Sequence, residues 1–157
     1  MYRHKRRDKV LLVIRNHRHE FLYVQDKRTS EWAYIMGGCK NYYNPIVDAV
    51  REFREETNNC LLLNSTRFNY SKTFRTSYRP PELLQQDKKE HIYVTSYYHV
   101  FEVILNENEV NDLLINYHNN TSNDETKDIL FSHQNAPIWS ITKYNLWSFM
   151  NIVYKFI

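Results

Sequence analysis

The sequence predicts one α/β domain in which a mixed β-sheet packs against helices. Two features support this class. Short β-branched and aromatic runs alternate with helical patterns along the chain. The only two glycines, Gly37 and Gly38, stand directly before the clearest helical pattern. No apolar stretch reaches the ~18 to 20 residues of a membrane span. We therefore expect a soluble, intracellular protein with a single domain over residues 1–157.

The strands are predicted from β-branched and aromatic runs separated by turn signals. The first covers residues 9–15, a polar turn follows at 16–19, and a second strand covers 20–25. A short third strand is expected over 32–36. Further strands are predicted over 61–63, 67–77 and 91–105, and an extended segment over 137–141.

The clearest helix is predicted over residues 44–58. Asn44 is a favourable N-cap, Pro45 suits the first helical position, and Asn58 tolerates the left-handed conformation that often ends a helix. The apolar residues at the spacing of one buried stripe are Ile46, Ala49, Val50 and Phe53. Weaker patterns predict helices over 109–117 and from Thr142 onward, with a polar loop over 119–128.

The central helix carries a cluster of carboxylates. Glu52, Glu55 and Glu56 stand at i, i+3 and i+4, with Asp48 one turn earlier. We expect them to share a face opposite the apolar stripe. They repel one another, and the helix dipole disfavours carboxylates in the last turn. A divalent cation would relieve both effects, because Mg²⁺ is held by carboxylates and substrate phosphates. A solvated acidic face, balanced by neighbouring arginines, is the alternative.

The glycine pair together with residues 51–56 (Arg-Glu-Phe-Arg-Glu-Glu) resembles the Nudix box. The family spacing fits when Gly37 is the box glycine. Tyr43 stands where the family has its first glutamate, and Asn58 stands at the terminal glycine. The first glutamate usually pairs with the box arginine, so Arg51 needs another acceptor, for which Asp48 is a candidate.

The resemblance implies a Nudix-like α/β/α sandwich with a mixed β-sheet, and a metal-dependent pyrophosphohydrolase that cleaves a diphosphate linkage. It implies Mg²⁺ or Mn²⁺ as the cofactor. The metal ligands would be Gly37, Glu52, Glu55 and Glu56, with the three glutamates also acting in catalysis. Many family members add a base from a later loop. We expect Glu125 in this role, with Asp128 and Glu102 as alternatives.

The substrate expected from the sequence is capped mRNA, cleaved at its 5′ cap with release of m7GDP. Basic residues cluster over 4–7 and recur from Arg67 to Arg79, where they could follow phosphates. The 13 Tyr, 8 Phe and 3 Trp offer faces on which bases and a cationic methylated guanine could stack. The candidate substrate-binding residues are Lys40, Tyr23, Trp32, Tyr34 and Arg75.

Two other functions remain open. One is hydrolysis of a small nucleotide, such as a nucleoside triphosphate, a dinucleoside polyphosphate or ADP-ribose. The other is a degenerate Nudix domain, marked by Tyr43, that binds nucleotide or RNA without cutting it. The abundance of Asn, Tyr, Ile and Lys and the irregular box resemble Nudix proteins of large DNA viruses. That resemblance implies a place in the host cytoplasm. We infer no membrane association and no obligate protein partner, and we expect Cys39 and Cys60 to be reduced.

Overall fold

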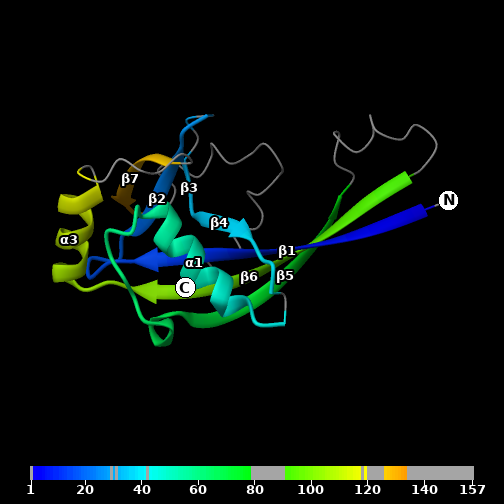
Figure 1. The fold of residues 1–157 in the computed structure, drawn as a ribbon, viewed down its shortest axis with the longest axis horizontal. Coiled ribbons are helices and arrows are strands. Elements are labelled where there is room, and N and C mark those ends of the chain that lie inside the picture. The colour runs from blue at the N-terminus through cyan, green and yellow to red at the C-terminus, as the bar shows by residue number, and fades with distance from the viewer. Residues whose placement is uncertain are drawn as a thin grey trace.

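The computed structural model describes residues 2–28, 30, 32–41, 43–78, 91–117, 119 and 126–133. Figure 1 shows a body of strands and helices from which three long strands project together, with the N-terminus near their tip. The elements in chain order are β1 (Tyr2–Arg15), β2 (Phe21–Asp26), β3 (Trp32–Ala33), β4 (Ile35–Gly38), α1 (Pro45–Glu56), the 3-10 turn η1 (Ser65–Arg67), β5 (Asn69–Tyr78), β6 (His91–Ile104), α3 (Glu107–Tyr117) and β7 (Thr126–Ser132).

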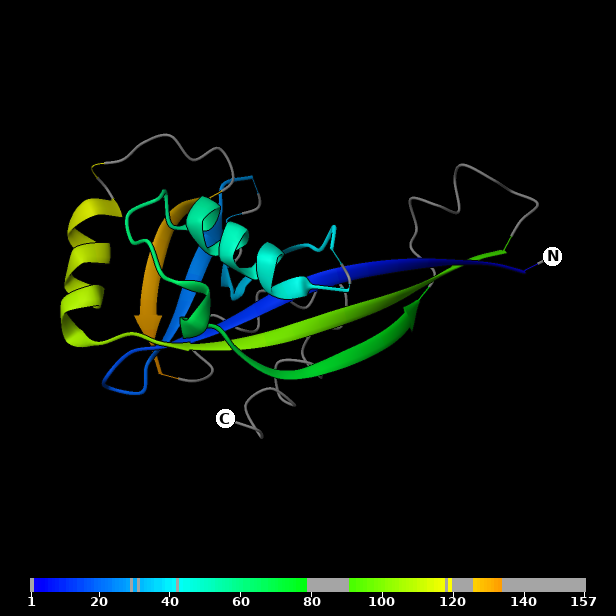
Figure 2. The same cartoon turned by 60° about the horizontal axis from the view of Figure 1, so that its bottom comes forward.

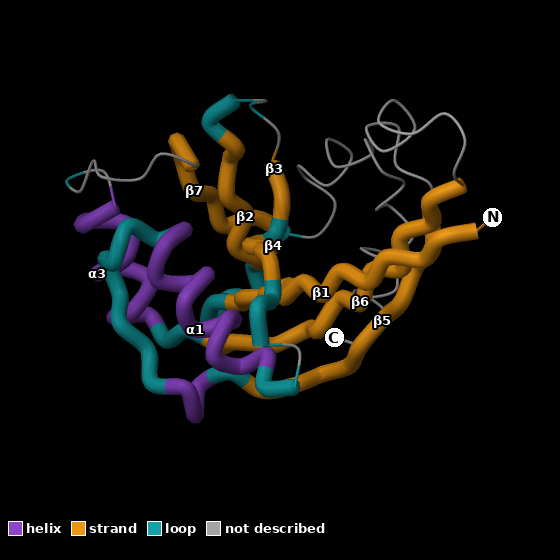
Figure 3. Tube along the Cα trace, turned by 45° about the vertical axis from the view of Figure 1, so that its right-hand side comes forward, coloured by secondary structure: helices purple, strands orange, loops and turns teal. Residues whose placement is uncertain are grey.

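The strands form one mixed sheet, which confirms the predicted α/β class. The order is β3-β2-β1-β6-β5, with β4 also paired to β1 and β7 to β2. β1 and β6 run parallel along their whole length, from Tyr2 opposite His91 to Arg15 opposite Ile104. The other pairings are antiparallel. Figure 3 shows β1, β6 and β5 leaving the body side by side.

The two faces of the sheet bury different clusters, because successive side chains of a strand point to opposite faces. On one face, Val10 and Leu12 of β1 pack with Ala49 and Phe53 of α1 and with Leu113 of α3. Figure 2 shows α1 and α3 on this side of the sheet. We call it the helical face. The other face buries a second cluster formed by Leu11, Val13, Phe21, Tyr23, Tyr34, Tyr98 and Val100.

The structure differs from the predicted elements in several places, including the predicted strand over 32–36, which is divided into β3 and β4. β1 begins at Tyr2 rather than at residue 9, because β6 supplies pairing partners along that whole stretch. The strand predicted over 61–63 is wrong: this segment is irregular, with Leu63 buried and Leu62 exposed. The strand β7 was not predicted. It begins within the last residues of the expected polar loop, continues to Ser132 and pairs with β2. The segment expected over 137–141 and the helix from Thr142 lie outside the described residues.

The start of α3 carries a reciprocal cap that the sequence pattern Asn-x-x-Glu could have revealed. The Glu109 N–H donates to Asn106 Oδ1 at 2.8 Å, and the Asn106 N–H donates to Glu109 Oε1 at 3.0 Å. Arg67 donates to both Glu109 oxygens at 2.8 and 2.7 Å and to the Ile104 carbonyl at 2.9 Å. Arg67 therefore ties η1 to α3. No helix in the described part of the chain is long and apolar enough to cross a membrane.

The Arg67–Glu109 pair makes stability depend on pH. The hydrogen bond from Arg67 holds the pKa of Glu109 below its ordinary 4.5. Ionised Glu109 therefore stabilises the fold at neutral pH, and this contribution is lost as the pH falls from about 4.5 through the lower folded-state pKa. We expect Glu109→Gln to lower the free energy of unfolding by about 1 kcal/mol at pH 7 and progressively less below pH ~4.5.

Urea unfolding at pH 7 and at pH 3 checks this expectation. Arg67 has a side chain that is 38% exposed, so solvent screening keeps the effect modest. Glutamine can still accept the hydrogen bond from the Asn106 N–H. The substitution therefore removes the charge of Glu109 but keeps its capping bond. Glu107→Gln, an exposed acid in the same first turn, is the control. A destabilisation by Glu109→Gln of equal size at both pH values would contradict the assignment to an ion pair.

Candidate active site

The local sequence around α1 sets its limits. The helix begins at Pro45, as predicted, with Asn44 at the N-cap position but without a side-chain capping bond. At the other end, Thr57 Oγ1 donates to the Phe53 carbonyl at 2.6 Å. Asn58 then takes a left-handed φ of 57°, which confirms its predicted role, and Asn59 repeats it with 56°. The two asparagines turn the chain away directly after the acidic last turn.

The acidic side of α1 faces the protein, which corrects the expectation of an acidic face opposite the core. Asp48, Glu52 and Glu56 are buried alongside Ala49 and Phe53. These carboxylates fall at i, i+4 and i+8, so they form one line along the helix. α1 packs on β4 as well as on β1, and Glu52, in the middle of this line, lies against Gly37 of β4. Burying charges is costly unless they are paired, so each needs a partner.

Gly37 lets the Glu52 carboxylate approach the backbone of β4. A Cβ placed on Gly37 would overlap the carboxylate of Glu52, whereas a Cβ on Gly38 would meet nothing within 4 Å. Neither glycine has a positive φ. The glycine requirement therefore comes from close packing and not from a turn, and it applies to Gly37, the glycine selected by the box spacing.

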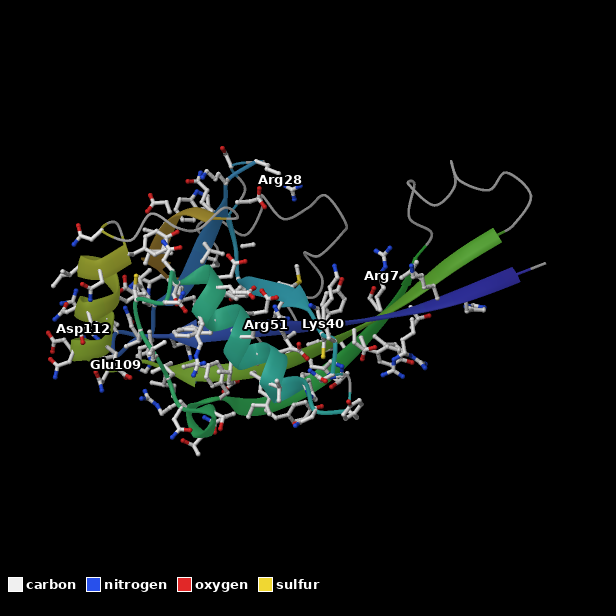
Figure 4. All side chains as sticks on the ribbon, viewed as in Figure 1. Arg7, Arg28, Lys40, Arg51, Glu109 and Asp112 are labelled. Carbon is white, nitrogen blue, oxygen red and sulfur yellow. The ribbon has the colours of Figure 1, made fainter. Side chains whose placement is uncertain are left out.

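Arg51 joins the carboxylates to β4, the strand that contains both glycines. Its Nη1 donates to Glu52 Oε1 at 2.9 Å and to both Glu55 oxygens at 3.2 Å. Its Nη2 donates to Asp48 Oδ1 at 3.1 Å and to the Gly38 carbonyl at 2.9 Å. Asp48 is thus the acceptor predicted to replace the missing box glutamate. Figure 4 labels Arg51 beside Lys40, where α1 approaches the end of β4.

Tyr43, the residue at the position of the family's first glutamate, is 78% exposed. Asp48 instead stands inside the helix. It accepts the Asn41 N–H at 2.9 Å and the Cys39 thiol at 3.3 Å as well as the bond from Arg51. The same arginine is therefore held from within α1, by a carboxylate that also fixes the loop between β4 and the helix.

These contacts set the ionisation of the network. Burial alone would raise the pKa of Asp48, but hydrogen bonds from Asn41 and Arg51 outweigh it and hold that pKa below its usual value. Burial would lower the pKa of Arg51, but its bond to Asp48 and the charges of Glu52 and Glu55 raise it instead. Burial and the bond to Asp48 raise the pKa of the Cys39 thiol to about 12, so this thiol is neutral and a poor nucleophile. Both cysteines are free.

The donor atoms suit a hard divalent cation, but they are not gathered around one point. Glu52 and Glu56 are buried, whereas the Glu55 side chain is 50% exposed. Among the described residues, no group of three or more His, Cys, Asp or Glu has the spacing to hold a metal ion. The Arg51 guanidinium bridges Glu52 and Glu55 and supplies the positive charge there. The chemistry of the carboxylates therefore fits Mg²⁺ or Mn²⁺, provided that these side chains rearrange.

Two of the predicted substrate-binding aromatics are core residues, which corrects that expectation. Tyr23 is fully buried and Tyr34 is 2% exposed. Their rings stack on each other at 5.2 Å between centroids, with an interplanar angle of 15°. Each ring is enclosed by the second cluster, so neither can receive a base from solvent. Trp32 is partly buried and packs against the same cluster.

The remaining predicted residues lie on different parts of the molecule. Lys40 is exposed next to the site, and Arg75 is exposed on β5. Glu102 lies on β6, and strand alternation places it on the face opposite α1, near Arg15 at 4.0 Å. Glu102 therefore cannot act as a base at α1. Asp128 is on β7, opposite Gln25, and Glu125 lies outside the described residues.

A mixed sheet with β4 packed against a carboxylate-bearing helix defines an α/β domain with a cluster of hard oxygen donors at the contact. Residues 5–145 match the family model described as the NUDIX domain. The chain belongs to the Nudix family and is a pyrophosphohydrolase of that family. No curated protein sequence matches it.

Solved structures resemble the fold at low identity. A binary complex of the Ap4A hydrolase of C. elegans has a TM-score of 0.60 and 13% identity, with 96% of each chain covered. The bifunctional NMN adenylyltransferase/ADP ribose pyrophosphatase of Francisella tularensis, complexed with AMP and a Mn ion, has a TM-score of 0.55 and 14% identity. The match covers 96% of this chain and 42% of that one. The E. coli dihydroneopterin triphosphate pyrophosphohydrolase has a TM-score of 0.52 and 12% identity, with 96% of this chain and 94% of that chain covered. At such identity the likeness concerns the fold.

Proposed function

We propose that the protein removes the 5′ cap of RNA by metal-dependent cleavage of a diphosphate linkage, releasing m7GDP. The observation that carries this proposal is the separation of charge next to the candidate site. The strands projecting from the body, residues 2–9, 72–78 and 91–98, are called the basic ribbon. They contain seven of the chain's 21 Lys and Arg residues but only one, Asp8, of its 18 acids. The remainder of the chain is therefore net negative.

This distribution favours a long polyanion over a small nucleotide. A small nucleotide needs a few cations close to the cleaved phosphates, such as Lys40 beside the site. A ribbon that leads away from the site adds nothing to its binding. RNA continues beyond the cap, and its phosphates would release counterions along such a surface. The sheet pairs Lys9 of the ribbon with Gly38, so the basic ribbon begins at the glycine strand itself.

In the proposed reaction, Glu52, Glu55 and Glu56 would hold the metal together with the Gly37 carbonyl. When bound, Mg²⁺ or Mn²⁺ neutralises the diphosphate and lowers the pKa of a water molecule. Gly37 keeps Glu52 against β4, and Arg51 aligns Glu52 and Glu55 from one guanidinium. Lys40 meets a phosphate of the substrate. Glu125 is the proposed general base.

Product analysis tests the function. Cap-labelled RNA, a cap dinucleotide, nucleoside triphosphates, a dinucleoside polyphosphate and ADP-ribose are each incubated with the protein and Mn²⁺ or Mg²⁺. We expect m7GDP from the RNA and little turnover of the uncapped nucleotides. The double variant Glu55→Gln with Glu56→Gln is the control for contaminating activity. Cleavage confined to a small nucleotide would overturn the RNA substrate. Binding of RNA or nucleotide without any cleavage would instead indicate a degenerate, non-catalytic domain.

A further inference from the structure

We propose that Arg6, Tyr97 and Arg75 form a stacking row that binds the unpaired RNA downstream of the cleaved diphosphate. This inference rests on the proposed function, because it names the part of the substrate that the basic ribbon would hold. It assigns a second contact region, separate from the carboxylates of α1, and a mode of binding in which bases as well as phosphates are recognised.

The strand register brings the three residues together on the helical face. Arg75 of β5 lies opposite Tyr97 of β6, and Tyr97 lies opposite Asp8 of β1. Arg6 is two residues before Asp8, so its side chain shares that face. The guanidinium carbon of Arg6 stands 4.0 Å from the centroid of the Tyr97 ring. The row therefore crosses all three strands of the basic ribbon.

A buried polar network holds Arg6 in this position. Arg6 donates to both Asp8 oxygens, from Nε at 2.7 Å and from Nη2 at 3.0 Å. Asp8 Oδ2 lies 2.8 Å from His99 Nε2, and His99 Nδ1 lies 3.0 Å from Thr73 Oγ1. The side chains of Asp8 and His99 are 6% and 9% exposed. Such a network fixes a planar guanidinium, which a single surface ion pair would not do.

The fixed guanidinium is nevertheless accessible. The Arg6 side chain is 51% exposed, and Arg75 is exposed on the outer strand of the ribbon. Bases of single-stranded RNA stack on aromatic rings and on arginine planes, and arginine also contacts phosphates. A duplex hides the faces of its bases, so this surface suits an unpaired strand. Stacking platforms also distinguish RNA from an acidic protein, for which charge alone would be sufficient.

The row lies within reach of the site. Val10 of β1 is opposite Gly37, and Arg6 lies four residues before Val10, toward the N-terminus of the same strand. At about 3.3 Å per residue, this is a separation of about 13 Å along the sheet. Figure 4 shows Arg7, next to Arg6 in sequence, beyond Arg51 and Lys40 on the way to the N-terminus. An RNA cleaved at the α1 carboxylates could therefore run outward along the ribbon.

Fluorescence anisotropy with an unstructured, 5′-capped RNA in EDTA tests the row without cleavage. We expect Arg6→Ala and Tyr97→Leu each to weaken binding about tenfold or more. Arg6→Lys keeps the positive charge but loses the planar guanidinium, so RNA binding by this variant should also be weakened. The matched control is Lys5→Ala, which removes one exposed charge from the opposite face of β1 and should weaken binding about twofold to threefold.

Salt dependence separates stacking from charge. Tyr97→Leu should lower affinity at every salt concentration without changing the slope of log affinity against log salt, whereas Lys5→Ala should change that slope. In cleavage assays, the ratio of capped-RNA to cap-dinucleotide turnover should fall for Arg6→Ala by the factor seen in binding. Thermal melting of each variant checks folding.

Wild-type affinity in both Arg6→Ala and Tyr97→Leu, or an equal loss in Lys5→Ala, would overturn the stacking row. Those results would leave the decapping proposal intact, since that proposal is decided by the products of the wild-type protein. Conversely, a wild-type protein that binds RNA through this row but leaves the cap uncut would refute decapping and retain the row.

Discussion

Replacing Glu56 with glutamine is expected to lower the rate of diphosphate hydrolysis by about two orders of magnitude or more while the protein remains folded. Glu56 is buried one turn after Glu52 on the same line of carboxylates. Glutamine has nearly the same shape but lacks the charge. The substitution therefore removes the metal ligand proposed at this position without opening a cavity, and turnover should fall because charge on the diphosphate is no longer neutralised.

Two measurements check the Glu56 prediction. Turnover is compared for the variant and the wild-type protein on the best substrate found. Thermal melting with and without Mn²⁺ then reports on the metal itself, and the stabilisation by Mn²⁺ should be reduced or absent in the variant. Asp112→Asn, an exposed acid on α3 that Figure 4 shows far from Arg51, is the control for general loss of negative charge. Turnover near the wild-type level in Glu56→Gln would refute the site assignment.

Gly37→Ala is expected to lower turnover by about tenfold to a hundredfold, and Gly38→Ala to change it by less than about twofold. The added methyl group at Gly37 would overlap the Glu52 carboxylate, whereas the methyl at Gly38 meets open space. The overlapping atoms are at the end of a flexible side chain, so Glu52 can swing away at little cost in stability. It then leaves the position that Gly37 and Arg51 give it.

The two glycines form a matched pair, since they are adjacent in one strand and neither has a positive φ. Alanine is therefore compatible with the backbone at both positions. Turnover and melting temperature are measured for both variants. Equal turnover in the two would show that contact with Glu52 does not matter. A Gly37→Ala protein that fails to fold would leave Glu52→Gln as the test, which displaces no backbone and should lose activity similarly.

Features that depend on neighbouring residues could be predicted from the sequence. Asn44, Pro45 and Asn58 define the ends of α1, because capping and left-handed turns are local properties. The box spacing likewise singles out Gly37, the glycine that meets Glu52. The partnership of Arg51 with Asp48 could be proposed because both stand on one helix, three residues apart.

Features that depend on distant segments could not be predicted in this way. The burial of Asp48, Glu52 and Glu56 is determined by how α1 packs on the sheet. The helical spacing alone is equally compatible with these side chains facing solvent. Tyr23 and Tyr34 are predicted as substrate contacts because they lie on elements leading into the box, but an aromatic on a strand can face either way. Their stacking depends on the pairing of strands that the local pattern does not specify. The Asp8–His99 contact likewise joins residues that are 91 positions apart in the chain.

The parallel pairing of β1 with β6 has a consequence for how the chain folds. The longest ladder of the sheet, from Tyr2–His91 to Arg15–Ile104, can form only after both strands are present. Such non-local contacts give a high contact order, which slows folding. During synthesis, the basic β1 would leave the ribosome with an unpaired edge and remain so until β6 emerges. In that interval a cationic, β-prone segment is open to incorrect partners, including the ribosomal RNA beside it and the edges of other nascent chains.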